Sequence, residues 1–225
     1  MKYVSLDLET TCIDPKCPEN ILQIAMVAED TSDIRDVDDL PSFKAIIVPE
    51  TGLITGSLTA LAMNTWIMIA IEIHKKASKA PTMTKAIIDA RDYFLSLGVP
   101  LETITRAEHA YTNNRMIGLQ SMIKETTDWL DEEFGKNSTG IIIAGKNIAG
   151  FDMGFLPKEL KRRFAHRTID PGSVFIDWSK KSPPSSNDLA AVYGSSHNGV
   201  VFHDAHQDAK DVITWLRHSY PTKEL

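Results

Sequence analysis

Alternating apolar and polar residues open the chain and predict its first strand. Residues 2–10 read Lys-Tyr-Val-Ser-Leu-Asp-Leu-Glu-Thr, which has the period-two pattern of a β-strand. Asp7 and Glu9 stand two apart, so both carboxylates project from one face, while Leu6 and Leu8 point the other way and can be buried. On this pair alone, an edge strand with a solvated acidic face is the ordinary interpretation and a cation site the sharper one.

Further apolar runs predict the rest of a sheet. Residues 21–28 and 43–48 are apolar segments with short polar connections, so the first three strands are expected to form an antiparallel meander. A continuous apolar run at 141–144 lies between glycines, which is typical of a strand buried on both faces. Residues 174–177 predict a fifth strand.

Helical periodicity fills most of the remaining chain. Helices are expected at 58–76 (one or two helices), 82–97, 116–134, 155–164, 187–193 and 205–218. Residues 101–114 lack a clear period and are predicted to form a loop. The pattern predicts an α/β fold with a five-stranded mixed sheet, three antiparallel strands and then two parallel ones, flanked by helices. No change in composition marks a boundary, so we expect one domain over 1–225 with a helical and loop insertion around 57–115.

Composition places the chain among soluble globular proteins. Of its 225 residues, 43% are hydrophobic and 24% are charged, and no apolar run is long enough to span a membrane. The formal charge of −6 argues against coating long nucleic acid by charge alone, although it leaves room for a local basic groove. The two cysteines, Cys12 and Cys17, are interpreted as reduced thiols, and no signal-peptide pattern opens the chain, so a cytoplasmic location is expected.

A second acidic position follows the buried strand. If a helix continues from Asp152, this residue forms one ridge with Leu156, Leu160 and Phe164, and its carboxylate lies on the core-facing side. Pro157 is tolerated only in the first turn of such a helix. The alternative is that Asp152 is simply a helix N-cap.

A third acidic position lies near the C-terminus. Asp204 followed by Gln207 is a capping-box pattern, which predicts that a helix begins at Ala205. Asp208 falls within the apolar face of that helix, where an unpaired acid is costly to bury, so it requires a cation. His203 stands just before the cap, where its imidazole can reach the same site, although a lone histidine there is more often a capping or surface residue.

Together these segments resemble the DEDD superfamily of 3′-to-5′ exonucleases, in the histidine-bearing branch that includes proofreading subunits and oligoribonucleases. The resemblance rests on three motifs in the family's order: Asp7-Leu8-Glu9-Thr10-Thr11, Asn147 through Phe151-Asp152, and His203 through Asp208. It covers residues 1–30 and 139–216 well, whereas 50–135 matches only as generic helices. Cys12 departs from the family, whose members often have glycine there.

The resemblance implies a ribonuclease H-like fold and a metal-dependent 3′-to-5′ exonuclease that releases nucleoside monophosphates from single-stranded 3′ ends by two-metal-ion hydrolysis. The implied cofactors are two divalent cations, Mg²⁺ or Mn²⁺. Asp7 would bridge them, Glu9 and Asp208 would complete one site, and Asp152 would help to hold the other. His203 would accept the proton of the attacking water.

The same resemblance implies the substrate contacts, which are Thr10, Thr11, Ile13, Asn147, Phe151, Lys161 and Arg162. Single-stranded DNA or RNA 3′ ends, including short oligonucleotides, are the expected partners, with a homodimer or a polymerase partner left open. Two alternatives remain: a catalytically weak binding subunit with the same fold that acts with a polymerase or another nucleic-acid enzyme, and another two-metal nuclease such as a ribonuclease H. A dinucleotide-binding fold is disfavoured because no G-x-G-x-x-G follows a strand.

Overall fold

The computed structural model describes residues 1–14, 20–195 and 203–221, and it contains a six-stranded mixed sheet. The strands are β1 (Lys2–Thr10), β2 (Ile21–Asp30), β3 (Ser42–Ile47), β4 (Arg115–Ile117), β5 (Ile141–Ala144) and β6 (Phe164–Ile169). Their order across the sheet is β4-β3-β2-β1-β5-β6. The first three strands pair antiparallel, as predicted, whereas β5 pairs parallel to β1, β6 to β5 and β4 to β3.

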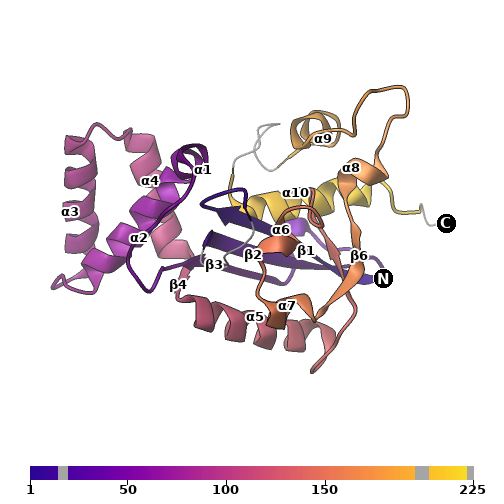
Figure 1. Ribbon diagram of the computed structural model, residues 1–225, viewed down its shortest axis with the longest axis horizontal. Helices are drawn as coiled ribbons and strands as arrows, with labels where there is room; N and C mark the ends of the chain where they lie inside the picture. The colour runs from indigo at the N-terminus through magenta and orange to yellow at the C-terminus, as the bar shows by residue number, and fades with distance from the viewer. Residues whose placement is uncertain (15–19, 196–202, 222–225) are drawn as a thin grey trace.

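Helices cover both faces of the sheet (Figure 1). They are α1 (Leu58–Met63), α2 (Thr65–Ala77), α3 (Met83–Ser96), α4 (Leu101–Asn113), α5 (Leu119–Phe134), α6 (Asp152–Phe155), α7 (Lys158–Lys161), α8 (Pro171–Val174), α9 (Ser186–Tyr193) and α10 (Ala205–Arg217), with a short 3₁₀ helix, η2, at Val37–Asp39. Among the described residues, no helix has both the length and the apolar character needed to cross a bilayer.

The central strand β1 is packed on both sides. Leu6 and Leu8 join one core cluster with Met122 of α5, while Tyr3 joins another with Val212 of α10. The side of β1 that carries Asp7 and Glu9 therefore faces α10. Because β1 pairs with both β2 and β5, the edge-strand alternative is wrong.

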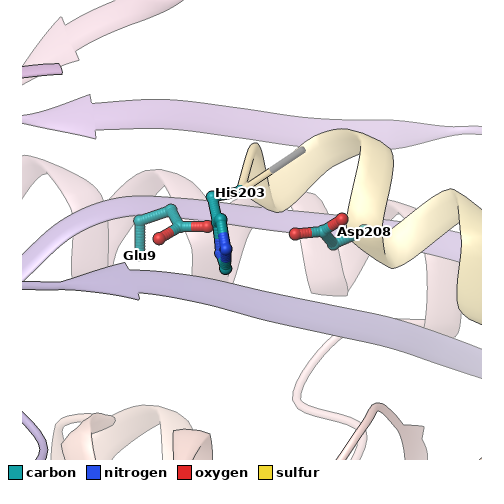
Figure 2. A group of neighbouring side chains, drawn as sticks. All are labelled: Glu9, His203 and Asp208. Carbon is teal, nitrogen blue, oxygen red and sulfur yellow. The ribbon is translucent and has the colours of Figure 1, made fainter. Parts of the chain in front are cut away.

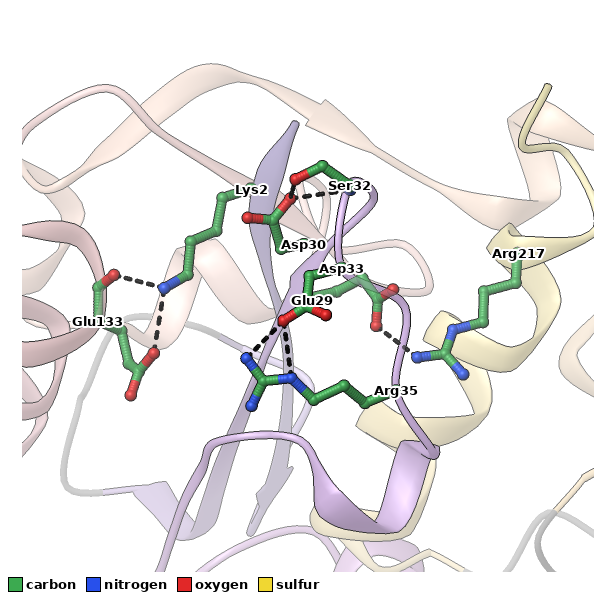
Figure 3. Close-up of polar contacts among 8 residues, drawn as sticks. All are labelled: Lys2, Glu29, Asp30, Ser32, Asp33, Arg35, Glu133 and Arg217. Atoms are coloured by element: carbon green, nitrogen blue, oxygen red, sulfur yellow. Dashed lines mark hydrogen bonds and ion pairs between the residues drawn. The ribbon is translucent and has the colours of Figure 1, made fainter. Parts of the chain in front are cut away.

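Polar contacts fasten the sheet at the end remote from Asp7 and Glu9 (Figure 3). The Lys2 ammonium lies 3.1 Å from the Glu133 carboxylate of α5, and the Arg217 guanidinium donates to the fully buried Glu29 carboxylate at 2.7 Å. A buried carboxylate needs such a partner. One end of α10 is thereby held against β2, while the other end reaches the edge of the sheet where β1 finishes.

We use the term helical unit for α1 to α4, residues 58–113. Its apolar core, which includes Trp66, Ile71 and Ala107, is continuous with Leu22 of β2 and Ile46 of β3. The predicted loop at 101–114 is wrong because this segment is α4, whose buried residues pack on α2. Small residues such as Ala107 and Ala110 make a weak sequence signal but allow close helix packing.

Three other predicted elements require correction. The helix expected at 116–134 begins only at Leu119, because Arg115–Ile117 pairs with β3 as a sixth strand. The helix expected at 155–164 is divided into α6 and α7, since Leu156 is extended before Pro157. The strand expected at 174–177 is absent from the described residues, and β6 at 164–169 takes its place beside β5. Cys12 is a free thiol, and Cys17 lies outside the described residues.

Candidate functional site

The C-terminal end of β1 carries the first two acids of the site. Glu9 is 7% exposed, and Asp7 is partly buried one pleat earlier on the same face. Figure 1 shows this end of β1 lying between the start of α10 and α6. Because β1 is a central strand, its end opens onto a crevice bounded by elements from both halves of the sheet.

Asp152 reaches the same place through the parallel pairing of β5 with β1. The loop after β5 passes close to β1, since a Cβ at Gly145 would lie 2.7 Å from the Leu6 carbonyl oxygen. Asp152 is 2% exposed, and its Oδ1 accepts a hydrogen bond of 3.0 Å from the Leu8 backbone N–H. Phe151, not Asp152, is the N-cap of α6, and the helix ends at Phe155, so both the N-cap and the extended-ridge predictions are wrong.

The start of α10 brings the third group. Asp204 caps the helix by accepting from the backbone N–H groups of His206 and Gln207, at 3.0 and 3.4 Å, and α10 begins at Ala205 as predicted. Glu9, His203 and Asp208 each offer one ligand atom within 4.8 Å of the other two. Figure 2 shows the imidazole between the two carboxylates. Three segments far apart in sequence thus meet at one point.

Crowding and burial raise the pKa of every acid in this cluster. For Asp7, burial has the largest effect, followed by the charges of Asp152, Asp208 and Glu9, and together they raise its pKa well above the ordinary value. Burial likewise raises the pKa values of Glu9, Asp152 and Asp208. A cation would offset this repulsion, and a set of carboxylate oxygens with one imidazole suits Mg²⁺ or Mn²⁺.

The two histidines beside the site have different surroundings. Burial, and then the charge of Arg106, lower the pKa of His203, so its imidazole is neutral at neutral pH. Burial, and then Lys210 and Lys44, lower the pKa of His206 to about 4. His206 therefore lies on the basic side of α10, away from the acids, as its helical position predicts.

A cavity of about 300 Å³ opens beside the acids. Of the residues predicted from the sequence, it is lined by Asp7, Glu9, Thr10, Ile13, Phe151, Asp152, His203 and Asp208. Ile13 is 81% exposed, whereas Thr10 is 6% exposed and donates from Oγ1 to the Cys12 carbonyl oxygen at 2.8 Å. All four predicted acids and the predicted base therefore share one cavity wall.

The other predicted contact residues lie around this cavity without lining it. Thr11 is 2% exposed, and Asn147 donates its backbone N–H to Asp170 at 2.7 Å. Lys161 donates to the Gly154 carbonyl oxygen at 2.8 Å, while Arg162 is exposed on the outside.

Sequence reasoning did not find several residues that the helical unit brings to the site. Met63 and Asn64 line the cavity, and the buried Asn64 amide donates to the Thr10 carbonyl oxygen at 3.1 Å. Arg106 donates to the His203 carbonyl oxygen at 2.9 Å. A polar amide beside Trp66, at the start of an apolar helix, was the one available signal for Asn64, and Arg106 had none, because its segment was predicted to be a loop.

Comparison with protein-family models gives no match. A search of curated proteins also finds no match. Two solved structures share the architecture. Exonuclease X in complex with 5′ overhanging duplex DNA matches at 15% identity and a TM-score of 0.48 over 98% of this chain and 95% of that one. E. coli Exonuclease I in complex with a dA16 oligonucleotide matches at 12% identity and a TM-score of 0.50 over 96% of this chain. The aligned region spans only 41% of the Exonuclease I chain. The second likeness confirms the expected ribonuclease H-like α/β fold, with six strands instead of five.

Proposed function

We propose that the protein is a metal-dependent 3′-to-5′ exonuclease that releases nucleoside monophosphates from the 3′ ends of single-stranded nucleic acid. The observation that carries the proposal is the meeting of Asp7, Glu9, Asp152 and Asp208 with His203 at one cavity, from three distant segments. The order and residue types match the histidine-bearing exonuclease branch. The fold shared with E. coli Exonuclease I, which was solved with an oligonucleotide, agrees with this assignment.

The four acids are the residues that would hold two divalent cations, Mg²⁺ or Mn²⁺. Their raised pKa values fit such a role, because burial without a cation penalises the charged carboxylates. When bound, such cations stabilise charge on the phosphate and the leaving oxygen and lower the pKa of water. The protein's own contribution is to hold carboxylates on three rigid elements so that they converge.

His203 would accept the proton of the attacking water on a ring nitrogen. Its neutral imidazole lies within 4.8 Å of oxygens of Glu9 and Asp208, so the proton acceptor stands beside the reacting centre. A lowered pKa keeps the ring unprotonated and ready to accept. General-base catalysis of this kind contributes roughly 10²–10⁴-fold in rate.

The cavity favours a terminal nucleotide over a duplex. Its volume of about 300 Å³ is at the lower end of ligand sites, and Ile13, Met63 and Phe151 offer apolar surface to a base or sugar. The backbone N–H groups of Thr10 and Thr11 and the side chain of Asn147 are the proposed polar contacts. Lys161 and Arg162 would lie along the strand on the upstream side.

Digestion of end-labelled oligonucleotides tests the proposal. Single- and double-stranded DNA and RNA are incubated with Mg²⁺, Mn²⁺ or EDTA, and the product lengths are resolved. We expect metal-dependent shortening from the 3′ end by one nucleotide at a time, loss of activity in Asp7→Asn, and wild-type activity in Asp89→Asn, which changes an exposed acid paired with Lys85. Rapid cleavage of circular single strands would refute the end requirement, and binding without hydrolysis would favour the binding-subunit alternative.

A further inference from the structure

The helical unit reaches the base of the proposed reaction through one side chain. Arg106 of α4 donates from Nη2 to the carbonyl oxygen of His203 at 2.9 Å, across 97 residues of sequence. This bond joins the helical unit to the short segment that carries the imidazole. A second contact, from Asn64 to the Thr10 carbonyl oxygen, joins the same unit to the end of β1.

Trp66 fixes the Arg106 guanidinium. The central carbon of the guanidinium lies 4.0 Å from the centroid of the Trp66 ring, and Trp66 itself is 2% exposed in the core between α2 and α4. A guanidinium stacked on a buried indole has few other orientations, and its planar fork leaves a donor directed at a neighbour. The donor is therefore fixed before substrate arrives.

The backbone that Arg106 contacts is in an uncommon conformation. His203 has φ of +49°, in the left-handed region that residues other than glycine adopt at a cost. On the other side, the Ala205 backbone N–H donates to Gln23 Oε1 at 3.1 Å, and Asp204 caps α10. The His203 peptide is thus fixed from both directions, which directs the imidazole toward Glu9 and Asp208.

We propose that Arg106 is a positioning residue that holds His203 in the orientation needed to accept a proton. The inference rests on the proposed exonuclease function. Two other roles are open to a cation here, because Arg106 also lies in the field of Asp204, Glu9 and Asp208. It could contact a substrate phosphate directly, or it could act as a counter-charge for the acids, and the experiment separates these roles.

Arg106→Met is the principal variant because it keeps a long side chain on Trp66 and removes the donor. With a single-stranded ten-nucleotide DNA and saturating Mn²⁺, we expect kcat to fall roughly 10- to 100-fold, the usual cost of a misplaced catalytic group, while KM changes less than about threefold. Arg106→Lys should recover part of kcat. Arg91→Met is the matched control, since Arg91 pairs with Glu108 within the helical unit, and it should retain kcat within about twofold.

The double variant with His203→Ala provides the decisive readout. If Arg106 acts through His203, Arg106→Met changes kcat less than about twofold once the imidazole is gone. A full loss in the His203→Ala background, or a KM increase that exceeds the kcat loss, would overturn the proposal in favour of a phosphate contact. A change in Mn²⁺ affinity of more than tenfold by calorimetry would overturn it in favour of a counter-charge role.

Amide hydrogen exchange tests the same contact without any chemistry. In the metal-free protein, Arg106→Met should increase exchange at residues 203–208 by about tenfold or more and leave the helical unit protected, whereas Arg91→Met should not change it. Unchanged exchange would contradict the proposal even if activity fell. If wild-type protein hydrolyses no strand, the proposed function fails, but this measurement still decides whether Arg106 holds the segment.

Discussion

At the scale of single residues, the molecule contains two kinds of buried acid. Glu29 is fully buried and receives a hydrogen bond of 2.7 Å from Arg217, so its charge serves packing. Asp7 is surrounded by further carboxylates, and its pKa is raised by burial and then by the charges of Asp152 and Asp208. A group that costs stability in this way is expected where function requires it.

Replacing one acid of each kind should therefore give opposite results. Asp7→Asn should abolish most nuclease activity while the melting temperature in EDTA holds or rises, because one like charge leaves the cluster. Glu29→Gln should lower the free energy of unfolding by about 3 kcal/mol, since it leaves Arg217 without its buried partner. Thermal melts and end-label digestion of both variants check this. An active Asp7→Asn enzyme would contradict the metal-site assignment, which extends equally to Glu9→Gln, Asp152→Asn and Asp208→Asn.

The two neighbouring histidines should also differ. His203→Ala should slow hydrolysis by roughly 10²–10⁴-fold, the usual contribution of a positioned base. His206→Ala should leave kcat within about tenfold of wild type, because its ring lies beside Lys210 and Lys44, and its pKa of about 4 keeps it neutral. Single-turnover rates at saturating metal make the comparison. Equal losses for both histidines would mean that the base is misassigned.

At the scale of elements, the sequence predicts those whose signal is local. The alternation in β1, the glycines around β5 and the capping pattern before α10 each placed an element that the structure confirms. The elements that were missed depend on distant partners: Arg115–Ile117 becomes a strand by pairing with β3, and α4 is stabilised by packing on α2. The acids came from local motifs, whereas Asn64 and Arg106 reach the site only through the fold.

The cap of α10 offers a test at this scale. Asp204→Ala should lower the free energy of unfolding by about 1 kcal/mol, because the backbone N–H groups of His206 and Gln207 lose their acceptor. Asp204→Asn keeps an acceptor and removes a charge that raises the pKa of Asp208, so metal-free stability should be retained. Urea titration of both variants measures the difference. Equal destabilisation by alanine and asparagine would show that the charge, and not the cap, is the important property.

At the scale of the whole molecule, the acidic cluster should set how stability depends on pH. An acid whose pKa is raised by folding holds its proton more tightly in the native state, so stability is fully present below the unfolded value of about 4. It is lost as pH rises through the raised values of Asp7, Glu9, Asp152 and Asp208.

In EDTA, the melting temperature should accordingly fall by about 4 °C or more between pH 5 and pH 8, the shift that about 1–2 kcal/mol produces in a chain of this size. Saturating Mn²⁺ should remove the fall, because the native state then binds cations that the unfolded chain does not gather. Asp7→Asn should flatten the EDTA profile. A melting temperature in EDTA that rises with pH over this range would contradict the account, and an Asp7→Asn, Asp208→Asn double variant that still responds fully to Mn²⁺ would place the metal elsewhere.

The last whole-molecule feature is the basic cluster after Asp152, which the fold divides into two groups. Arg163 is 7% exposed and bonded to Asp131, and Lys161 donates to the Gly154 carbonyl oxygen, so both have structural partners. Lys158, Arg162 and Arg167 are exposed and remain available to the phosphates of an upstream strand. With a net charge of −6, the protein depends on such local charge to hold a polyanion.

Replacing Lys158 and Arg162 with alanine should raise KM for a ten-nucleotide single strand more than for a dinucleotide, because only the longer strand reaches past the cavity. It should also reduce the salt slope of log affinity for the long strand by about 1.4, at about 0.7 for each phosphate that is no longer neutralised. Basic side chains on phosphates position a strand without reading its bases, so the effect should not depend on sequence. Lys124→Ala is the matched control, since Lys124 is exposed on α5 and paired with Asp128. Equal effects on both substrate lengths would show that the strand follows another path.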